Sequence, residues 1–178
     1  EKYDRKSIEK RNVNKVKLQE MLNLPVDENI PMIGMVTRLV SHKGLEMVKK
    51  AFEELMKEKV QLVVLGTGDA QYEGFFKDME NRHGNKLRAI IAFNQDLSRK
   101  IYAASDIFLM PSIAEPCGLS QMIASRYGSV PLVRRTGGLA DSIFDFTVKG
   151  NGYTFDNVEV INGEFNVEIN DLLNKYNS

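Results

Sequence analysis

The sequence predicts a doubly wound α/β fold, in which helices cover a parallel sheet. Two observations point to this fold class: short apolar runs rich in Val, Ile and Leu recur along the chain, and longer segments of helical periodicity separate them. The chain has 178 residues, of which 43% are hydrophobic, so one domain with a single sizeable core is expected.

The apolar runs give the predicted strands in order along the chain. Five runs are strong candidates: Ile33 to Val36, Val60 to Gly66, Leu87 to Phe93, Asp106 to Pro111 and Val130 to Arg135. The segment GYTF around Tyr153 is a weaker sixth candidate. After Phe155 the periodicity weakens, and only INDLLNKY at 169–176 suggests a further short helix.

Helices are predicted between these strands. The segment from Gly44 to Lys59 carries a single apolar stripe and charged residues elsewhere, as expected of a crossover helix. Further covering helices are predicted at Tyr72 to Asn81, Leu97 to Ala104, Leu119 to Tyr127 and Leu139 to Phe146. The first 25 residues read as a charged helix followed by a turn, and we interpret them as a linker from an interdomain region.

Charge and cysteine content exclude several function classes. Twenty-four Lys and Arg balance 24 Asp and Glu, so we expect neither a nucleic-acid nor a membrane partner. No apolar run approaches the roughly 20 residues that span a bilayer. Cys117 is the only cysteine, and His42 and His83 are separated, so we expect no disulfide, no metal site and a reducing, cytoplasmic location.

In a doubly wound sheet, ligands bind beyond the carboxyl ends of the strands, so the loops that follow the strands are the candidate sites. The first such loop places Arg38 and Lys43 where both can face one anion, although from spacing alone two solvated cations are the commoner arrangement. The second carries Gly66 and Gly68, which permit either a ligand contact or a tight turn capped by Asp69.

The third and fifth loops are weaker candidates. Phe93 offers a flat face to a base, although an aromatic residue at a strand end is more often part of the core, and Asn94 or Asp96 can cap the next helix. Paired glycines at 137 and 138 permit close backbone approach, as would a helix entry without any ligand.

The fourth loop, PSIAEPCGLSQM, is the most unusual stretch of the chain. It places Glu115 and Cys117 directly before a predicted helix, beside the free amides of Gly118, Leu119 and Ser120. A carboxylate next to free amides suits a ligand with both hydroxyl and phosphate groups, whereas the alternative is that Glu115 only favours the helix dipole. Because all five loops meet at one sheet edge, the sequence favours a phosphate-bearing ligand.

Several motifs together carry a family resemblance. In order along the chain, TRLVSHKGL, LGTGDAQYEGFF, YAASDIFLMPS, EPCGLSQ and RYGSVPLVRRTGGLADSI resemble the carboxy-terminal domain of bacterial glycogen synthases and plant starch synthases. The match runs from about Tyr3 to Phe155, and EPCGL and PLVRRTGGLAD are its most specific parts. This family has two Rossmann-like domains facing a cleft, and it transfers glucose from ADP-glucose or UDP-glucose to the non-reducing end of an α-1,4-glucan with retained anomeric configuration.

The resemblance also implies residue roles. Arg38 and Lys43 would hold the donor diphosphate and stabilise its leaving charge without a metal or cofactor, and Glu115 would contact the transferred glucose. Residues 26–178 would then form the donor-binding domain. The implied donor-binding residues are Gly66, Gly68, Phe93, Cys117, Gly118, Leu119, Ser120, Thr136 and Gly137.

Some positions depart from the family pattern. Ile113 and Ala114 stand where an Arg-Phe pair is common, and Phe93 replaces a tyrosine, so ring stacking on a base is kept but a hydroxyl contact is lost. Ile123 stands where related retaining enzymes often carry a second glutamate.

The amino-terminal domain of the family, which holds the acceptor glucan, has no counterpart in these residues. We therefore expect the chain alone to bind the donor without catalysing transfer. The expected location is the cytoplasm or, in a plant, the plastid stroma. The alternative is a non-catalytic nucleotide-sugar-binding module. A dinucleotide-dependent oxidoreductase is disfavoured, because Gln71 occupies the third glycine position of the fingerprint.

Overall fold

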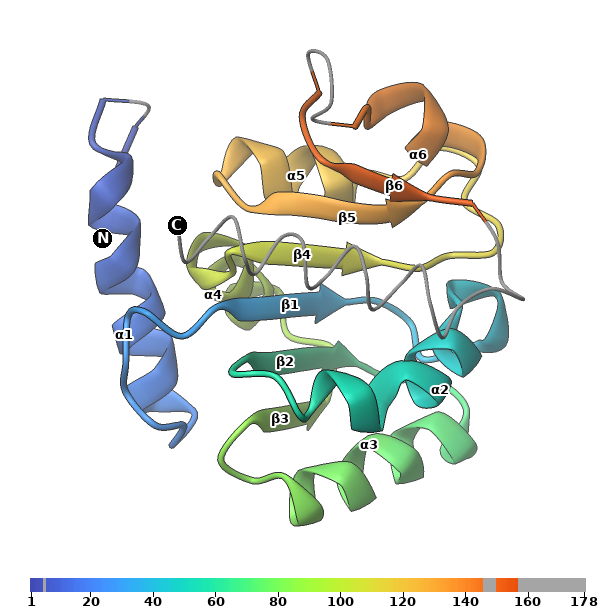
Figure 1. The fold of residues 1–178 in the computed structure, drawn as a ribbon, viewed down its shortest axis with the longest axis horizontal. Helices are drawn as coiled ribbons and strands as arrows, with labels where there is room; N and C mark the ends of the chain where they lie inside the picture. Colours follow the sequence, from blue (N-terminus) through green and yellow to red (C-terminus); the bar gives the residue numbers. More distant parts are fainter. Residues whose placement is uncertain (5, 146–149, 157–178) are drawn as a thin grey trace.

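The computed structural model describes residues 1–4, 6–145 and 150–156. These residues form a six-stranded parallel sheet in the order β3-β2-β1-β4-β5-β6, which confirms the predicted fold class (Figure 1). The strands are β1 (Met32–Val36), β2 (Gln61–Gly66), β3 (Leu87–Ile91), β4 (Ile107–Met110), β5 (Val130–Arg134) and β6 (Tyr153–Phe155).

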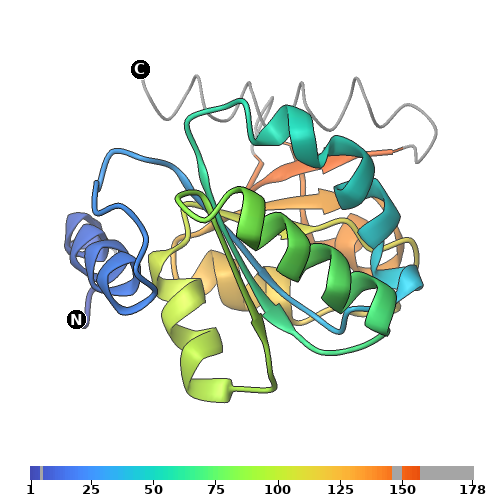
Figure 2. The same ribbon diagram turned by 90° about the horizontal axis from the view of Figure 1, so that it is seen from below.

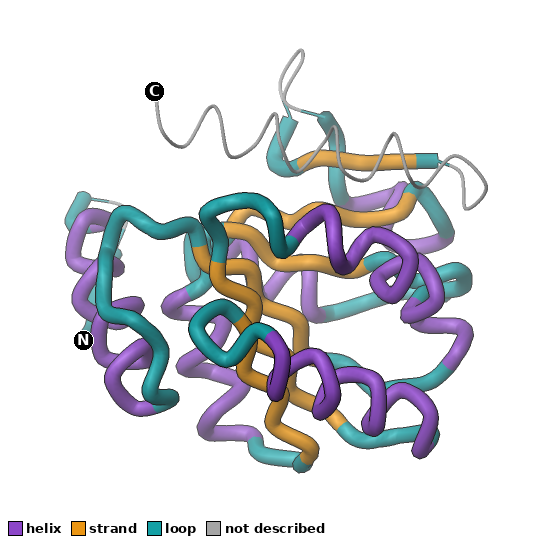
Figure 3. Tube along the Cα trace, turned by 60° about the horizontal axis from the view of Figure 1, so that its bottom comes forward, coloured by secondary structure: helices purple, strands orange, loops and turns teal. Residues whose placement is uncertain are grey.

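Helices cover both faces of the sheet (Figures 2 and 3). They are α1 (Arg11–Met21), α2 (Leu45–Leu55), α3 (Ala70–Arg82), α4 (Gln95–Ala104), α5 (Ser120–Arg126) and α6 (Gly137–Ser142), with short 3-10 helices η1 (Ile8–Lys10) and η2 (Ser41–Lys43). Helices α2 and α3 pack on one face, and α4, α5 and α6 pack on the other.

The continuous apolar runs arise because both faces of each central strand are buried. In β2, Leu62 and Val64 belong to the core beneath α2 and α3, while Val63 and Leu65 belong to the core beneath α4. All four side chains are at most 2% exposed. A strand alternates its side chains between the two faces, so a run that is apolar at every position is expected in a sheet covered on both sides.

Two predicted boundaries are wrong in detail. Strand β3 ends at Ile91 rather than at Phe93, whose side chain is 94% exposed. Helix α6 covers Gly137–Ser142 rather than Leu139 to Phe146. Beyond Ser142 the backbone bonds to the Asn151 side chain instead of continuing the helix. The Asn151 amide donates to Ser142 O at 2.9 Å, and its side-chain carbonyl accepts from Phe144 N at 2.9 Å. Phe146 and the short helix expected at 169–176 lie outside the described residues.

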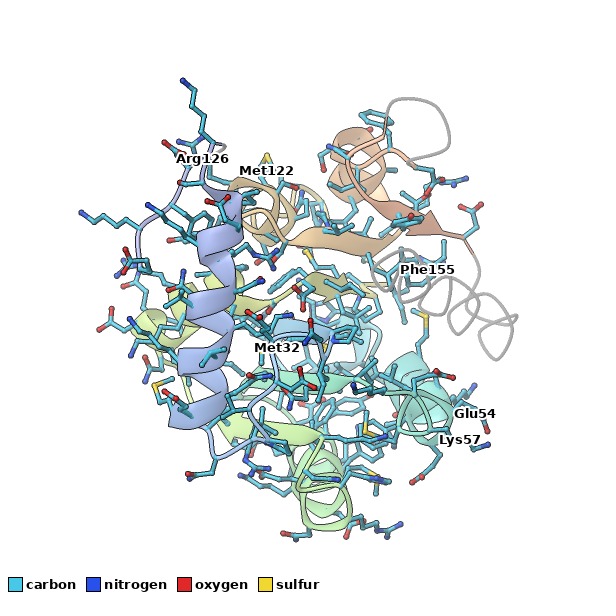
Figure 4. All side chains as sticks on the ribbon, turned by 60° about the vertical axis from the view of Figure 1, so that its left-hand side comes forward. Met32, Glu54, Lys57, Met122, Arg126 and Phe155 are labelled. Carbon is cyan, nitrogen blue, oxygen red and sulfur yellow. The ribbon has the colours of Figure 1, made fainter. Side chains whose placement is uncertain are left out.

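Helix α1 lies across the amino-terminal edge of the sheet, close to Met32 (Figure 4). Its Lys15 is 1% exposed, and Nζ lies 2.7 Å from Oδ2 of Asp106, the residue directly before β4. The same carboxylate accepts a hydrogen bond of 2.7 Å from Met32 N, and Arg11 lies 3.4 Å from its other oxygen. Removing one partner of a buried ion pair is strongly destabilising, because the other charge is left buried and unpaired. The pair between Lys15 and Asp106 therefore fixes α1 to the sheet. A linker role for residues 1–25 stays a prediction.

Among the described residues, no helix is both long enough and apolar enough to span a membrane.

Candidate functional site

The sheet order places a topological switch point between β1 and β4. Strand β1 is followed in sequence by β2 on one side, whereas β4 is followed by β5 on the other. The chain therefore leaves β1 and β4 toward opposite sides of the strand order, and a switch point of this kind is where open α/β sheets bind their ligands.

A small cavity of about 70 Å³ lies at this switch point. The ends of β1 and β4, together with the loops that follow them, supply its walls. The lining residues are Val36, Thr37, Lys43, Leu109, Met110, Pro111, Ser112, Glu115, Gly118, Leu119 and Ser120.

Lys43 and Glu115 meet in this cavity, although 72 positions separate them in sequence. Lys43 Nζ lies 2.5 Å from Glu115 Oε2, and the two side chains are 17% and 13% exposed. Ser112 Oγ donates to the same carboxylate oxygen at 3.1 Å. The cation and the carboxylate that the sequence singled out therefore form one ion pair. It joins the β1 loop, residues 37–44, to the β4 loop, residues 111–119.

The position of Lys43 follows from the backbone around it. Lys43 ends η2, and Gly44 then adopts a left-handed conformation with φ of 74°. A Cβ at Gly44 would overlap the Pro111 carbonyl oxygen, so only glycine allows the β1 loop to approach the β4 loop this closely. His42 O also accepts a hydrogen bond of 2.9 Å from Ile113 N. These contacts hold Lys43 beside the segment that carries Glu115.

Glu115 is held in turn by the β5–α6 junction, residues 134–138. Gly138 N donates to Glu115 O at 3.0 Å, and a Cβ at Gly137 would overlap that same oxygen. Arg134 Nη1 and Thr136 Oγ1 both donate to Ile113 O, at 3.1 and 3.3 Å. The β5–α6 junction thus positions the loop after β4, and direct contacts of Thr136 and Gly137 with a donor stay predictions.

Ser120 has a partner that the sequence did not indicate. Tyr102 on α4 donates to Ser120 Oγ at 3.0 Å. Burial raises the pKa of Tyr102, and the hydrogen bond with Ser120 only partly opposes that rise. The phenol is therefore neutral at pH 7 and acts as a donor. No sequence signal pointed to this pair, because 18 residues separate its members.

Gln121 supports the same segment. It is 0% exposed, and its Nε2 donates to the carbonyl oxygens of Cys117 and Gly118 at 3.2 and 3.1 Å. The side chain of Cys117 is exposed and does not line the cavity. Cys117 therefore contributes its backbone to the architecture of the site.

Arg38 and the glycines of the β2 loop lie outside the cavity lining. Arg38 is exposed, and its guanidinium lies 3.5 Å from His42 Nε2. Gly66 and Gly68 pack against the backbone of the β1 loop: a Cβ at these positions would overlap the carbonyl oxygens of Thr37 and Leu39. Close loop packing is thus sufficient to require both glycines, and their contact with a donor stays a prediction.

The helix-capping predictions have mixed outcomes. Asn94 Oδ1 accepts from Leu97 N at 2.9 Å and caps α4, as expected. Asp69 occupies the corresponding position before α3, but its side chain makes no capping hydrogen bond. Glu73 makes a separate contact in this turn, in which its Oε1 accepts from Gly68 N at 2.8 Å. Of the two alternatives for this loop, the tight turn is present with Asp69 as the N-cap residue, but without a capping hydrogen bond from its side chain.

Phe93 is an exposed aromatic ring at the carboxyl end of β3, not a core residue. Strand β2 separates β3 from β1, so Phe93 lies on one flank of the switch point. An exposed ring can stack on a planar ligand, and this role stays a prediction.

Within the described ranges, no group of three or more His, Cys, Asp or Glu residues is arranged to hold a metal ion.

Comparisons with known proteins agree with this architecture. A family model described as glycosyl transferases group 1 matches residues 17–177. The glycogen synthase of Clostridium acetobutylicum is 55% identical over 158 residues, which are 87% of this chain and 33% of that protein. The glycogen synthase of Pseudothermotoga lettingae is 52% identical over 156 residues, 86% of this chain and 32% of that protein. The chain thus spans about a third of the length of these curated relatives.

Two solved structures are also similar to this chain. The catalytic domain of starch synthase IV from Arabidopsis thaliana, bound to ADP and acarbose, matches with a TM-score of 0.89 and 35% identity, over 98% of this chain and 37% of that one. HepE from Anabaena, in complex with UDP and glucose, matches with a TM-score of 0.68 over 92% of this chain and 42% of that one. At 20% identity, the second match shows the fold alone. The resemblance to glycogen and starch synthases is confirmed.

Proposed function

Because this chain belongs to the group 1 glycosyltransferases, as a domain of the glycogen and starch synthase type, we propose that it binds the nucleotide-sugar donor of a glucan synthase. The donor is ADP-glucose or UDP-glucose. The complete enzyme transfers the glucose to the non-reducing end of an α-1,4-glucan and retains the anomeric configuration.

The convergence of Lys43 and Glu115 at the switch point carries this proposal. A nucleotide sugar needs a cation for its diphosphate and a hydrogen-bond acceptor for its sugar hydroxyls. An ammonium group offers three donors and a carboxylate is acceptor-only, so the pair supplies one partner for each half of the donor.

Lys43 and Arg38 act electrostatically on the leaving group. As the bond between the glucose C1 and the diphosphate oxygen breaks, negative charge grows on that oxygen, and the two cations stabilise it. Arg38 lies outside the cavity on the same loop, and its long side chain can turn toward a bound diphosphate. The acceptor oxygen then bonds to C1 on the same face, and its proton passes to the departing phosphate, so no enzymatic nucleophile is required.

The adenine nucleotide is favoured over the uridine nucleotide as the donor. The Arabidopsis relative, at 35% identity, was solved with ADP. Phe93 provides an exposed ring on the flank of the site that can stack on the base.

The acceptor glucan binds to an amino-terminal partner domain outside these 178 residues. The two-domain architecture of the resembling family and the chain's coverage of about a third of its relatives support this proposal. A non-catalytic nucleotide-sugar-binding module remains the alternative, and transfer activity of the chain joined to a partner domain separates the two.

Calorimetric titration of the chain with ADP, UDP, ADP-glucose and NAD tests donor binding. ADP and ADP-glucose are expected to bind most tightly, UDP more weakly, and NAD not at all, because a dinucleotide pocket requires a glycine where the chain has Gln71. NAD binding with no response to ADP-glucose would contradict the proposed function. Weak binding to all four ligands alike would also contradict it, because no donor would be selected.

A further inference from the structure

The ion pair between Lys43 and Glu115 determines which ligand the site can hold. Both groups are largely buried, and each is the other's partner at 2.5 Å. The cavity that they share is about 70 Å³, whereas drug-sized ligands occupy roughly 300 to 1,000 Å³. The part of a nucleotide sugar that contacts both groups therefore cannot fit between them while the pair is closed, so binding of that part requires the pair to open.

Opening the pair has opposite consequences for its two members. Lys43 gains a phosphate in place of the carboxylate, which restores its charge partner. Glu115 loses its cation while it remains largely buried, and Ser112 at 3.1 Å is then its remaining side-chain donor. A buried carboxylate without its cation is unfavourable, and a phosphate nearby adds repulsion between like charges.

A sugar supplies what Glu115 loses. Glucose hydroxyl groups donate hydrogen bonds, and a carboxylate accepts them at both oxygens. A ligand with phosphate alone satisfies Lys43 and leaves Glu115 unpaired, whereas a ligand with phosphate and sugar satisfies both residues.

We propose that the Lys43–Glu115 ion pair makes the site selective for an intact sugar nucleotide over the free nucleoside diphosphate. This inference rests on the proposed donor-binding function. It adds that Glu115 weakens binding of the diphosphate product, which favours product release after transfer. Without the ion pair, we would expect removal of the Glu115 charge to leave ADP binding near normal, since the carboxylate serves only the sugar. The observed pair changes that expectation.

The test measures the affinities of inorganic pyrophosphate, ADP and ADP-glucose for the chain and for Glu115→Gln. Glutamine keeps the size of the side chain and removes its charge. Pyrophosphate and ADP are expected to bind about tenfold more tightly to the variant, since one unfavourable charge interaction is removed. ADP-glucose is expected to bind no more tightly, because its hydroxyl groups lose a charged acceptor. The preference for ADP-glucose over ADP should then fall about tenfold or more.

Glu54→Gln is the matched control. Glu54 and Lys57 also form an ion pair, with a distance of 2.6 Å, but they are exposed at the carboxyl end of α2, away from the cavity (Figure 4). This variant should leave all three affinities unchanged. Weaker binding of all three ligands by Glu115→Gln would differ from the expected split and would overturn the selectivity role.

The outcomes separate the two proposals. If the parent chain binds ADP and ADP-glucose, and Glu115→Gln leaves ADP binding equal or weaker, the selectivity role of the ion pair is overturned while donor binding stands. If neither the parent nor the variant binds any of the three ligands, the donor-binding proposal fails and the selectivity proposal fails with it.

Discussion

Two cations follow β1, but their surroundings differ. Lys43 is 17% exposed and paired with Glu115, whereas Arg38 is exposed beside His42. A largely desolvated ammonium interacts with an anion more strongly than a solvated guanidinium does, because water screens the exposed charge. At the scale of single residues, we therefore expect Lys43 to be the main phosphate-binding group of the proposed site.

Substitution of either cation should weaken ADP binding. The loss of a charge-assisted hydrogen bond is worth roughly 1.5 to 3 kcal/mol, or about ten- to a hundredfold in affinity. We expect Lys43→Ala at the upper end of this range and Arg38→Ala at the lower end, as measured by calorimetric titration. Lys57→Ala, which removes an exposed cation outside the cavity, should leave the affinity unchanged. Equal ADP affinity in all four proteins would contradict the phosphate assignment.

Lys43→Ala should also reduce the stability of the chain. It leaves Glu115 largely buried without its cation, and breaking a buried pair costs about 3 to 5 kcal/mol in well-buried cases, with less expected at 13% exposure. The double variant Lys43→Ala/Glu115→Gln should recover much of this loss, because no unpaired charge remains. Chemical denaturation measures both effects, and a double variant no more stable than Lys43→Ala would contradict this account.

At the scale of elements, glycines place the loops in contact with one another. Gly44 lets the β1 loop approach Pro111 of the β4 loop, and Gly137 lets the start of α6 approach Glu115. The site is therefore built by loop-to-loop packing at the ends of three strands. This packing fixes the side chains that face the cavity, although none of these glycines needs to touch a ligand.

Gly44→Ala tests this packing directly. The left-handed conformation, with φ of 74°, costs a non-glycine residue roughly 1 to 2 kcal/mol, and the added Cβ would overlap the Pro111 oxygen. The chain should lose at least about this much unfolding free energy, and ADP affinity should fall because Lys43 moves with the loop.

Gly74→Ala is the control for that substitution. Gly74 lies within α3 and has open space around its Cβ position. Alanine should stabilise the helix by about 0.5 to 1 kcal/mol and leave ADP affinity unchanged. A Gly44→Ala variant as stable as the parent would show that the β1 and β4 loops tolerate separation.

At the scale of the whole molecule, donor binding and catalysis are expected to separate. In the proposed architecture the acceptor hydroxyl is placed by an opposing domain, and closure of the cleft brings the reacting atoms together. Without that domain the bound donor faces solvent, and proximity effects worth roughly 7 to 11 kcal/mol in favourable cases are lost.

The isolated 178 residues should therefore show no glucan synthesis with ADP-glucose and a primer. Incorporation of labelled glucose measures this, first with the chain alone and then with the chain fused to an amino-terminal domain from a related glycogen synthase. Activity only after fusion would support the proposal. Primer-dependent incorporation by the chain alone would overturn the view that it is one half of an enzyme.

The sequence alone determined the fold class, because every central strand is buried on both faces and so carries a continuous apolar run. It also identified Lys43 and Glu115, since each follows a strand and all parallel strands end at the same edge. Three features required the structure: the ion pair, the Tyr102–Ser120 hydrogen bond, and the contact of Glu73 with the Gly68 amide. The first two join residues that meet only after the sheet has set its strand order and the glycines have brought the loops together. The last is a local contact between Glu73 and the Gly68 amide, which depends on the conformation of the β2 loop and which the spacing of residues does not encode.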